Sequence, residues 1–525
     1  MAEIDTGPPE RAGGRVASLG WIAGGAGFLF FLFWPGLGLD NAQRGVAATT
    51  TLTAALWLTN AIPLGAASLI PAALMPLLGV MSAREVGPTY MHDIVLLFVG
   101  AFMLALGLER WGMHRRIALA IVQTVGTSPR RVVLGFMVSS AALSMWISNT
   151  ATTLLMLPIA LAVIATLEPR KDSRESPLAV CLLLGIAYSA SIGGTATLVG
   201  TAPNLAFRSI LSETFPDAPE PSFGEWIVNW FPLTVLFVPI AWFLLTRFLS
   251  PVGSVASGSD EERRAGEEIS AARRALGAMT RGQILMSIMF FGTALLWVTR
   301  ADLDLGFVRF SGWAGALAPE GVERAVFMKM ISDTTVVMAM VVACFAIPVN
   351  SKRGEFLLDW QTAVKLPWEI ILLFGGGLCI AKGFQDSGLA SVLGEQLAPL
   401  LVDQPAWLIV LATALFLSFL TEITSNTATT FVLLPVAAHG AVEAGINPLL
   451  VMLPATIAAS MAFMLPVATP PNAIVFSSRR FGISKMAYVG FWLNLVGVLL
   501  LTLIFEYWVR GVGGLSSELP VWAKP

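Results

Sequence analysis

The sequence predicts an all-α polytopic membrane protein, and three observations support that fold class. The 525 residues are 56% hydrophobic and only 13% charged, whereas soluble domains carry about 25% charged residues. Apolar stretches recur along the chain, and several approach the roughly 20 residues that a spanning helix needs. Three landmark segments occur twice in the same order, which indicates two homologous halves. We expect about 11 transmembrane helices and two re-entrant hairpins, arranged in two inverted repeats.

The expected spans follow the apolar stretches in chain order. Stretches of full length fit complete helices, whereas the shorter ones fit broken or re-entrant segments. A polar connector, residues 251–281, separates a first half, residues 20–250, from a second half, residues 282–510. The apolar stretches cover residues 21–39, 94–108, 178–198, 231–248, 336–347, 370–380, 408–420, 449–467 and 488–505.

The distribution of Lys and Arg sets the expected orientation, since cytoplasmic loops carry an excess of both. Arginines precede the first span and crowd the connector, so we place residues 1–19 and the connector in the cytoplasm. The tail, residues 511–525, has one lysine and is expected outside. Residues 1–15 lack the pattern of a removable signal peptide. The expected location is the inner (plasma) membrane.

Composition and motifs argue against several other classes of protein. A net charge of −2 gives no basic footprint for nucleic acid. The three histidines show no metal-ligand spacing, and the three cysteines lie in apolar runs, where inert packed thiols are expected. No nucleophile or zinc-hydrolase motif is present, which disfavours an intramembrane enzyme. No cofactor is expected.

Three landmarks relate the two halves. Asp93 begins an apolar segment that matches the one beginning at Glu369, an offset of 276 residues. The hexapeptide Ser-Asn-Thr-Ala-Thr-Thr occurs at residues 148–153 and again at 425–430, an offset of 277. A Pro-Asn pair ends the third landmark at Asn204 and Asn472, an offset of 268. In transporters such repeats are often inverted across the membrane, and they meet at the binding site.

Each hexapeptide is expected at the tip of a hairpin, residues 148–150 and 425–427. The apolar segments beside it are too short to span comfortably and fit re-entrant arms. Non-helical backbone at mid-membrane is tolerated where it lines a cavity, and helix N-termini there can bind an anion.

The Pro-Asn pairs are expected to break two long helices beside the tips. Proline removes a backbone donor, so the freed carbonyl groups can coordinate a small cation. Neither motif contains Lys or Arg, so an anion would rely on neutral donors, and sodium would supply positive charge through hard oxygen ligands. Alternatively, Ser, Thr and Asn merely join helices, but their duplication favours a site. The neutral donors are Asn149, Thr150, Thr201, Asn426, Thr427 and Thr469.

At these residues the chain resembles the divalent anion/sodium symporter family, specifically its sodium-coupled dicarboxylate transporters. Both Ser-Asn-Thr tips of that family are intact, and the resemblance covers essentially the whole chain. It implies a homodimer in which each protomer has a scaffold domain and a transport domain that moves as an elevator. One departure is Ala202, where many relatives carry proline, as this chain does at Pro470.

The resemblance also implies a substrate site and two sodium sites. The substrate would meet Ser148, Asn149, Thr150, Ser425, Asn426, Thr427, Thr201, Thr469 and Pro470. The first sodium ion would meet Ser144, Ser148, Asn149 and Gly200. The second sodium ion would meet Thr421, Thr424, Ser425, Asn426 and Ala468.

The leading hypothesis is sodium-coupled symport of the C4-dicarboxylates succinate, malate and fumarate. A dicarboxylate exchanger and a sulfate or citrate symporter of the same family are the alternatives. Glu422 lies within the second motif region and is either a structural hydrogen-bond acceptor or a coupling residue. Lys382 is expected to snorkel or to form an ion pair.

Overall fold

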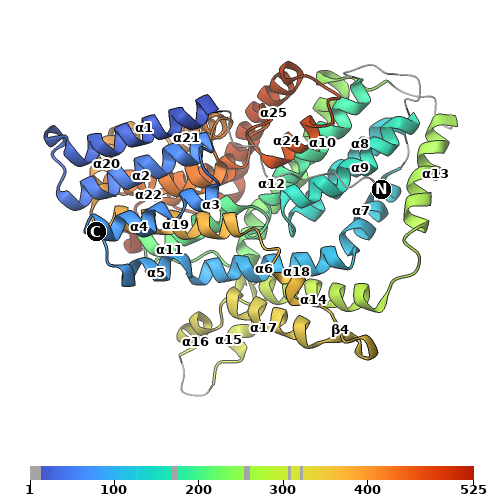
Figure 1. The fold of residues 1–525 in the computed structure, drawn as a ribbon, viewed down its shortest axis with the longest axis horizontal. Helices are drawn as coiled ribbons and strands as arrows, with labels where there is room; N and C mark the ends of the chain where they lie inside the picture. Colours follow the sequence, from blue (N-terminus) through green and yellow to red (C-terminus); the bar gives the residue numbers. More distant parts are fainter. Residues whose placement is uncertain are drawn as a thin grey trace.

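The computed structural model is mostly helical (Figure 1) and describes residues 14–126, 128–167, 176–253, 260–304, 309–319 and 323–524. Three expected segments lie partly outside the described residues: the N-terminal segment 1–19, the connector 251–281 and the tail 511–525. The all-α expectation misses two short antiparallel strand pairs in loops, which are too short to leave an alternating pattern in the sequence. The pairs are β1 (Leu303–Asp304) with β2 (Arg309–Phe310), and β3 (Pro348–Asn350) with β4 (Glu355–Phe356).

The first helices form a peripheral hairpin and three short segments. The N-cap Asp40 accepts a hydrogen bond from the backbone of Gln43, whose side chain bonds back to the backbone of Asp40, so the second helix has a complete capping box. These elements are α1 (Gly14–Phe33), η1 (Pro35–Leu37), α2 (Asn41–Thr59), α3 (Leu64–Ala67), α4 (Ile70–Leu77) and α5 (Ala83–Tyr90).

The first repeat half continues with seven helices and ends in a π-helical turn. The elements are α6 (Asp93–Arg110), α7 (Met113–Val125), α8 (Pro129–Ser144), α9 (Asn149–Leu167), α10 (Pro177–Gly194), α11 (Ala202–Thr214), α12 (Phe223–Leu244) and η2 (Leu245–Leu249). Of these, α10 is the most deeply placed, because 94% of its residues are buried.

The middle of the chain contains the connector helix and the segments that lead to the second half. The connector helix α13 stands at the edge of the molecule, across the direction of α14 (Figure 1). The elements are α13 (Asp260–Arg274), α14 (Arg281–Val298), α15 (Trp313–Ala316), α16 (Arg324–Met330), α17 (Asp333–Ala346), η3 (Ser351–Arg353) and α18 (Trp360–Ala363).

The second half repeats the order of elements of the first. Its elements are α19 (Trp368–Asp386), α20 (Leu389–Leu397), η4 (Ala398–Leu400), α21 (Ala406–Leu420), α22 (Asn426–Glu443), α23 (Leu449–Ala459), α24 (Pro470–Phe476), α25 (Ile483–Ile504), η5 (Phe505–Arg510) and, in the tail, η6 (Val521–Ala523).

Matching elements of the two halves agree closely in length and in local geometry. Helices α12 and α25 both have 22 residues, lie 260 residues apart and continue into a π-helical turn. Helices α8 and α9 both pack on α10, just as α21 and α22 both pack on α23. The described structure therefore extends the correspondence well beyond the three landmarks visible in the sequence.

Seven described helices are long and apolar enough to cross a membrane, and four shorter apolar helices accompany them. One of the seven is α9, with 19 residues, and α22 has 18 residues. The expectation that the segment after the tip is too short to span is therefore wrong for the first copy, whereas α22 is not among the seven. The apolar stretch in the sequence does not include the polar first turn of either helix, but the structure shows that this turn is helical in both copies.

Candidate functional site

The two hexapeptides fold in the same way. Ser148 and Ser425 precede α9 and α22, and each side chain accepts a hydrogen bond from the backbone N–H three residues later. Thr153 and Thr430 each donate to the carbonyl group of the asparagine that begins the helix, at 2.8 Å in both copies. The serine cap and the threonine bonds let a polar segment start a helix inside an apolar protein.

The asparagines that begin these helices remain accessible. Asn149 and Asn426 are half-buried, and neither side chain is needed for the helix cap. The Asn426 Oδ1 atom has no hydrogen-bond partner in the described part of the chain. The adjacent Thr150 is half-buried and Thr427 is buried, both on the first helical turn. Each tip therefore offers polar groups at a helix N-terminus, where an anion is favoured.

Three of the four residues expected around the first sodium ion lie together. The Ser144 hydroxyl donates to the Asn149 side-chain oxygen. A methyl group added at Gly194 would lie 2.8 Å from that oxygen and 3.0 Å from the carbonyl oxygen of Gly200. Hydroxyl, amide and carbonyl oxygens thus converge at a glycine without a side chain, a set that suits a hard cation. The fourth residue, Ser148, uses its hydroxyl as the helix cap.

The asparagine of each Pro-Asn pair anchors the loop before it. Asn204 Nδ2 donates to the carbonyl groups of Gly194, at 3.1 Å, and Thr197, at 2.7 Å. Asn472 Nδ2 donates to those of Ala462 and Leu465, both at 3.0 Å. Asn204 and these two acceptors in the first half lie 268 residues before their counterparts in the second half. The sequence landmark therefore corresponds to the same pair of hydrogen bonds in both halves. Both asparagines are fully buried.

The substitution of alanine for proline at position 202 leaves the first break unchanged in shape. Helices α11 and α24 begin at Ala202 and Pro470, and their N-caps Thr201 and Thr469 have nearly the same backbone angles. Thr201 is half-buried, and its hydroxyl lies 3.5 Å from that of Ser460, in the other half.

The broken helix of each half packs against the tip helix of the other half. Helix α11 contacts α22, and α24 contacts α9. The helices that carry the candidate site residues of the two halves therefore pack on each other.

The residues expected around the second sodium ion are less closely gathered. The hydroxyls of Thr421 and Thr424 donate to carbonyl groups of their own helix, both at 2.9 Å. Ala468 is buried in the loop before α24, three residues after Leu465. Among the described residues, hydrogen bonds from Glu422 and from Ser418, whose hydroxyl donates to the Met461 carbonyl group at 2.8 Å, join this loop to the segment before the tip.

Glu422 is buried and accepts four hydrogen bonds. Its carboxylate receives the backbone N–H groups of Phe463, Met464 and Leu465 at 2.7–3.0 Å and the side chain of Asn494, on α25, at 2.7 Å. This geometry supports the structural-acceptor interpretation of Glu422. In the first half the corresponding residue is Met145, whose backbone carbonyl accepts from the Thr197 hydroxyl instead.

Lys382 forms ion pairs, as expected, with Glu213 at 3.4 Å and Asp386 at 3.2 Å.

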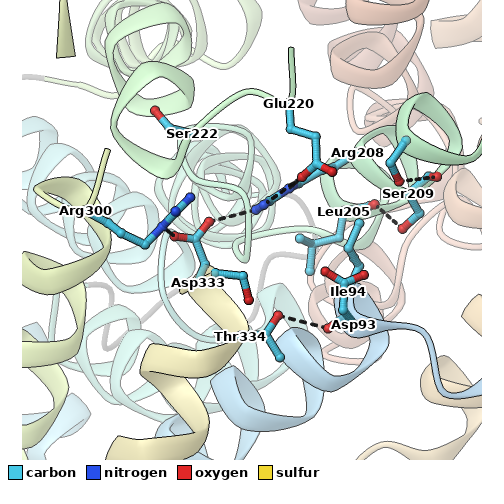
Figure 2. Close-up of polar contacts among 12 residues, drawn as sticks. Asp93, Ile94, Leu205, Arg208, Ser209, Glu220, Ser222, Arg300, Asp333 and Thr334 are labelled. Atoms are coloured by element: carbon cyan, nitrogen blue, oxygen red, sulfur yellow. Dashed lines mark hydrogen bonds and ion pairs between the residues drawn. The ribbon is translucent and has the colours of Figure 1, made fainter. Parts of the chain in front are cut away.

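Sequence reasoning missed a buried cluster formed by Arg208, Arg300 and Asp333 (Figure 2). The available signal was an arginine four residues after the Pro-Asn break, because a charge among apolar residues of a membrane protein is rare.

Comparison with known proteins identifies the family. The profile of a family described as "Sodium:sulfate symporter transmembrane region" matches residues 26–515. The chain belongs to this family, the divalent anion/sodium symporters. Within it, the chain is 38% identical over 496 residues to the sodium-dependent dicarboxylate transporter SdcS of Staphylococcus saprophyticus, covering 92% of this chain and 90% of that protein. The Staphylococcus aureus SdcS is 36% identical over 487 residues, covering 91% and 88%.

Two solved structures share the fold at low sequence identity. Neisseria gonorrhoeae MtrF, described among antimetabolite efflux pumps, has a TM-score of 0.58 and 15% identity over 94% of this chain and all of that one. The Alcanivorax borkumensis YdaH transporter has a TM-score of 0.53 and 14% identity over 93% of this chain and all of that one. Both support a multi-pass membrane fold for this symporter family member.

Proposed function

We propose that the protein is a sodium-coupled symporter of C4-dicarboxylates such as succinate, malate and fumarate. The observation that carries this proposal is the pair of matched tips and loops, which offer neutral donors and hard oxygen atoms at the meeting of the two halves. The SdcS relatives, sodium-dependent dicarboxylate transporters that match over most of their length, support the choice of ion and substrate class.

The proposed substrate carboxylates contact the tips and the starts of the broken helices. The polar groups are the side chains of Ser148, Asn149, Thr150, Thr201, Ser425, Asn426, Thr427 and Thr469, and the Pro470 ring at the start of α24 gives an apolar contact to the substrate. Sodium binds between tip and loop in each half. Two cations beside a dianion offset the cost of removing its negative charge from water, which a site without Lys or Arg does not offset by charge. Sodium and substrate therefore bind with positive coupling.

The proposed carrier is a homodimer in the plasma membrane with its N-terminus in the cytoplasm. In each protomer the tips and broken helices move as one transport domain relative to a scaffold. Paired broken helices at a repeat interface are the usual basis of alternating access in carriers with internal repeats.

Isothermal titration calorimetry of the purified protein tests the coupling. Succinate should bind more tightly in sodium buffer than in choline buffer, and succinate should raise the affinity for sodium by the same factor. Equal succinate affinities in the two buffers would favour the dicarboxylate exchanger. The family description names sulfate, so a titration with sulfate belongs beside it: sulfate binding without succinate binding would favour the sulfate symporter.

A further inference from the structure

A network of charges joins the middle of α11 to the end of α14 and the start of α17 (Figure 2). Asp333, the first residue of α17, is fully buried. Its Oδ2 atom accepts from Arg208 Nη1 at 2.8 Å, and its Oδ1 atom accepts from Arg300 Nε at 2.5 Å. The Arg208 and Arg300 side chains are only 5% and 10% exposed. Glu220, on the connection from α11 to α12, has a 44% exposed side chain and accepts from Arg208 Nε and Nη2 at 3.2 and 3.1 Å.

Stability alone is a weak reason for such a network. Burying charges costs several kcal/mol per ion, and well-packed apolar residues often serve as well or better. Buried ion pairs are best attested where they specify one arrangement over another. The arrangement at issue here is the position of α11 against the ends of α14 and α17.

The network divides into two neutral pairs at a single bond. Arg208 and Glu220 lie on α11 and the connection that follows it, whereas Arg300 and Asp333 flank the connection from α14 to α17. If the bond between Arg208 and Asp333 opens, each arginine keeps one carboxylate from its own segment. Breaking a buried ion pair is usually costly because it leaves a buried charge unpaired. Opening this bond leaves none.

Arg208 and Asp333 each lie in a segment that is held by hydrogen bonds or packing to neighbouring elements on its own side of the bond. On one side, Arg208 lies one turn beyond Asn204, which anchors the loop of the first sodium site, and Trp226 on α12 donates to Thr195 of that loop at 3.0 Å. On the other side, Trp297 donates to the Asp333 carbonyl group at 2.9 Å, and α6, α14 and α17 pack on one another.

We propose that the bond between Arg208 and Asp333 is a conformational latch, which holds α11 and its sodium-binding loop against α14 and α17 and opens when α11 moves. This inference rests on the proposed transport function, since it requires a second conformation. When α11 moves, the neutral pair Arg208–Glu220 separates from the neutral pair Arg300–Asp333. The strength of the bond between Arg208 and Asp333 determines the fraction of molecules in which the latch is open.

Thiol labelling measures latch opening without any transport assay, so the result can be interpreted even if the proposed substrate is wrong. The reporter is Ser222→Cys, because Ser222 is 9% exposed and precedes Phe223, which stacks on Trp297 of α14 at 4.8 Å. The natural cysteines are all buried, which keeps background labelling low. The maleimide reaction rate is measured on the full-length protein in lipid nanodiscs, with and without sodium.

The latch predicts opposite effects of its two carboxylates. Asp333→Asn removes the closing bond and should raise the labelling rate about tenfold, within the usual range of coupling between states. Glu220→Gln removes the partner that Arg208 keeps on opening, so labelling should slow. Glu506→Gln, in an ion pair with Arg510 inside one helical segment, is the control and should change nothing.

A purely structural network predicts that both variants loosen the protein, so faster labelling in both would overturn the latch. An unchanged rate in Asp333→Asn would overturn it as well. If Asp333→Asn fails to fold, the variant with Arg208→Met, Arg300→Met and Asp333→Leu replaces it, because it leaves no buried charge within the triad. That variant should be monodisperse and label faster than the parent; labelling at the parent's rate would contradict the latch.

Discussion

Asn149 and Asn426 are the residues on which the account of the site depends most directly. Each begins a helix whose cap is the preceding serine, so replacing the asparagine leaves the cap intact. The substitutions Asn149→Ala and Asn426→Ala should each weaken succinate binding roughly 10- to 150-fold, since a hydrogen bond to a charged group contributes about 1.5–3 kcal/mol.

Calorimetry in sodium buffer measures this loss, and thermal unfolding checks that both variants remain folded. Thr166→Val is a suitable control, because Thr166 lies near the far end of α9 and its hydroxyl bonds only to its own helix among the contacts described. Wild-type affinity in either asparagine variant would show that the two tips do not form one shared site.

Gly194 provides a test that is specific to the first half. A methyl group added at Gly194 would lie 2.8 Å from Asn149 Oδ1 and 3.0 Å from the Gly200 carbonyl oxygen, and the matching position in the second half is Ala462. Gly194→Ala should weaken sodium binding by about 5- to 150-fold, as overpacking costs about 1–3 kcal/mol. Ala462→Gly is the matched control and should have little effect on the sodium dependence of succinate binding. Equal effects of the two substitutions would contradict a cation site at Gly194.

At the scale of elements, Glu422 joins the second tip to the loop between α23 and α24. Glu422→Ala leaves the backbone N–H groups of Met464 and Leu465 without an acceptor, each at a cost of about 1–3 kcal/mol, whereas the Phe463 N–H group keeps the Asn494 side-chain oxygen at 3.2 Å. Glu422→Gln keeps one acceptor oxygen but turns an amide donor toward the loop, so its effect should be intermediate.

Thermal unfolding and the sodium dependence of succinate binding should therefore rank wild type above Glu422→Gln and Glu422→Ala lowest. If the two variants lose sodium dependence equally while unfolding like wild type, Glu422 acts through its charge as a coupling residue. That result would contradict the structural role assigned by its hydrogen bonds.

The elements that sequence reasoning predicts well are those with a repeated landmark. The helix starts at Asn149 and Asn426 and the breaks before Asn204 and Asn472 all coincide with duplicated motifs. The lengths of α9 and α22 are not predicted, because hydropathy counts their polar first turn as loop. Side-chain caps and threonine bonds to the preceding turn stabilise that helical turn, and neither contributes to an apolar pattern.

At the scale of the whole molecule, the missed features are contacts between distant segments. The duplicated motifs predict a site between the two halves, but not that α11 packs on α22 and α24 on α9. Arg208 and Asp333 are separated by 125 residues, and neither belongs to a repeated motif. Long-range pairing of this kind leaves no periodic signal in one sequence, so only the folded chain reveals it.

Sodium-driven accumulation of succinate is the most direct test of the central claim. Purified protein is reconstituted into proteoliposomes that contain labelled succinate at the same concentration inside and outside, and an inward sodium gradient is applied. The account predicts net uptake against the growing succinate gradient, which an equal choline gradient does not produce. Equilibration of label without net accumulation, at the same rate in sodium and in choline, would contradict sodium-coupled symport.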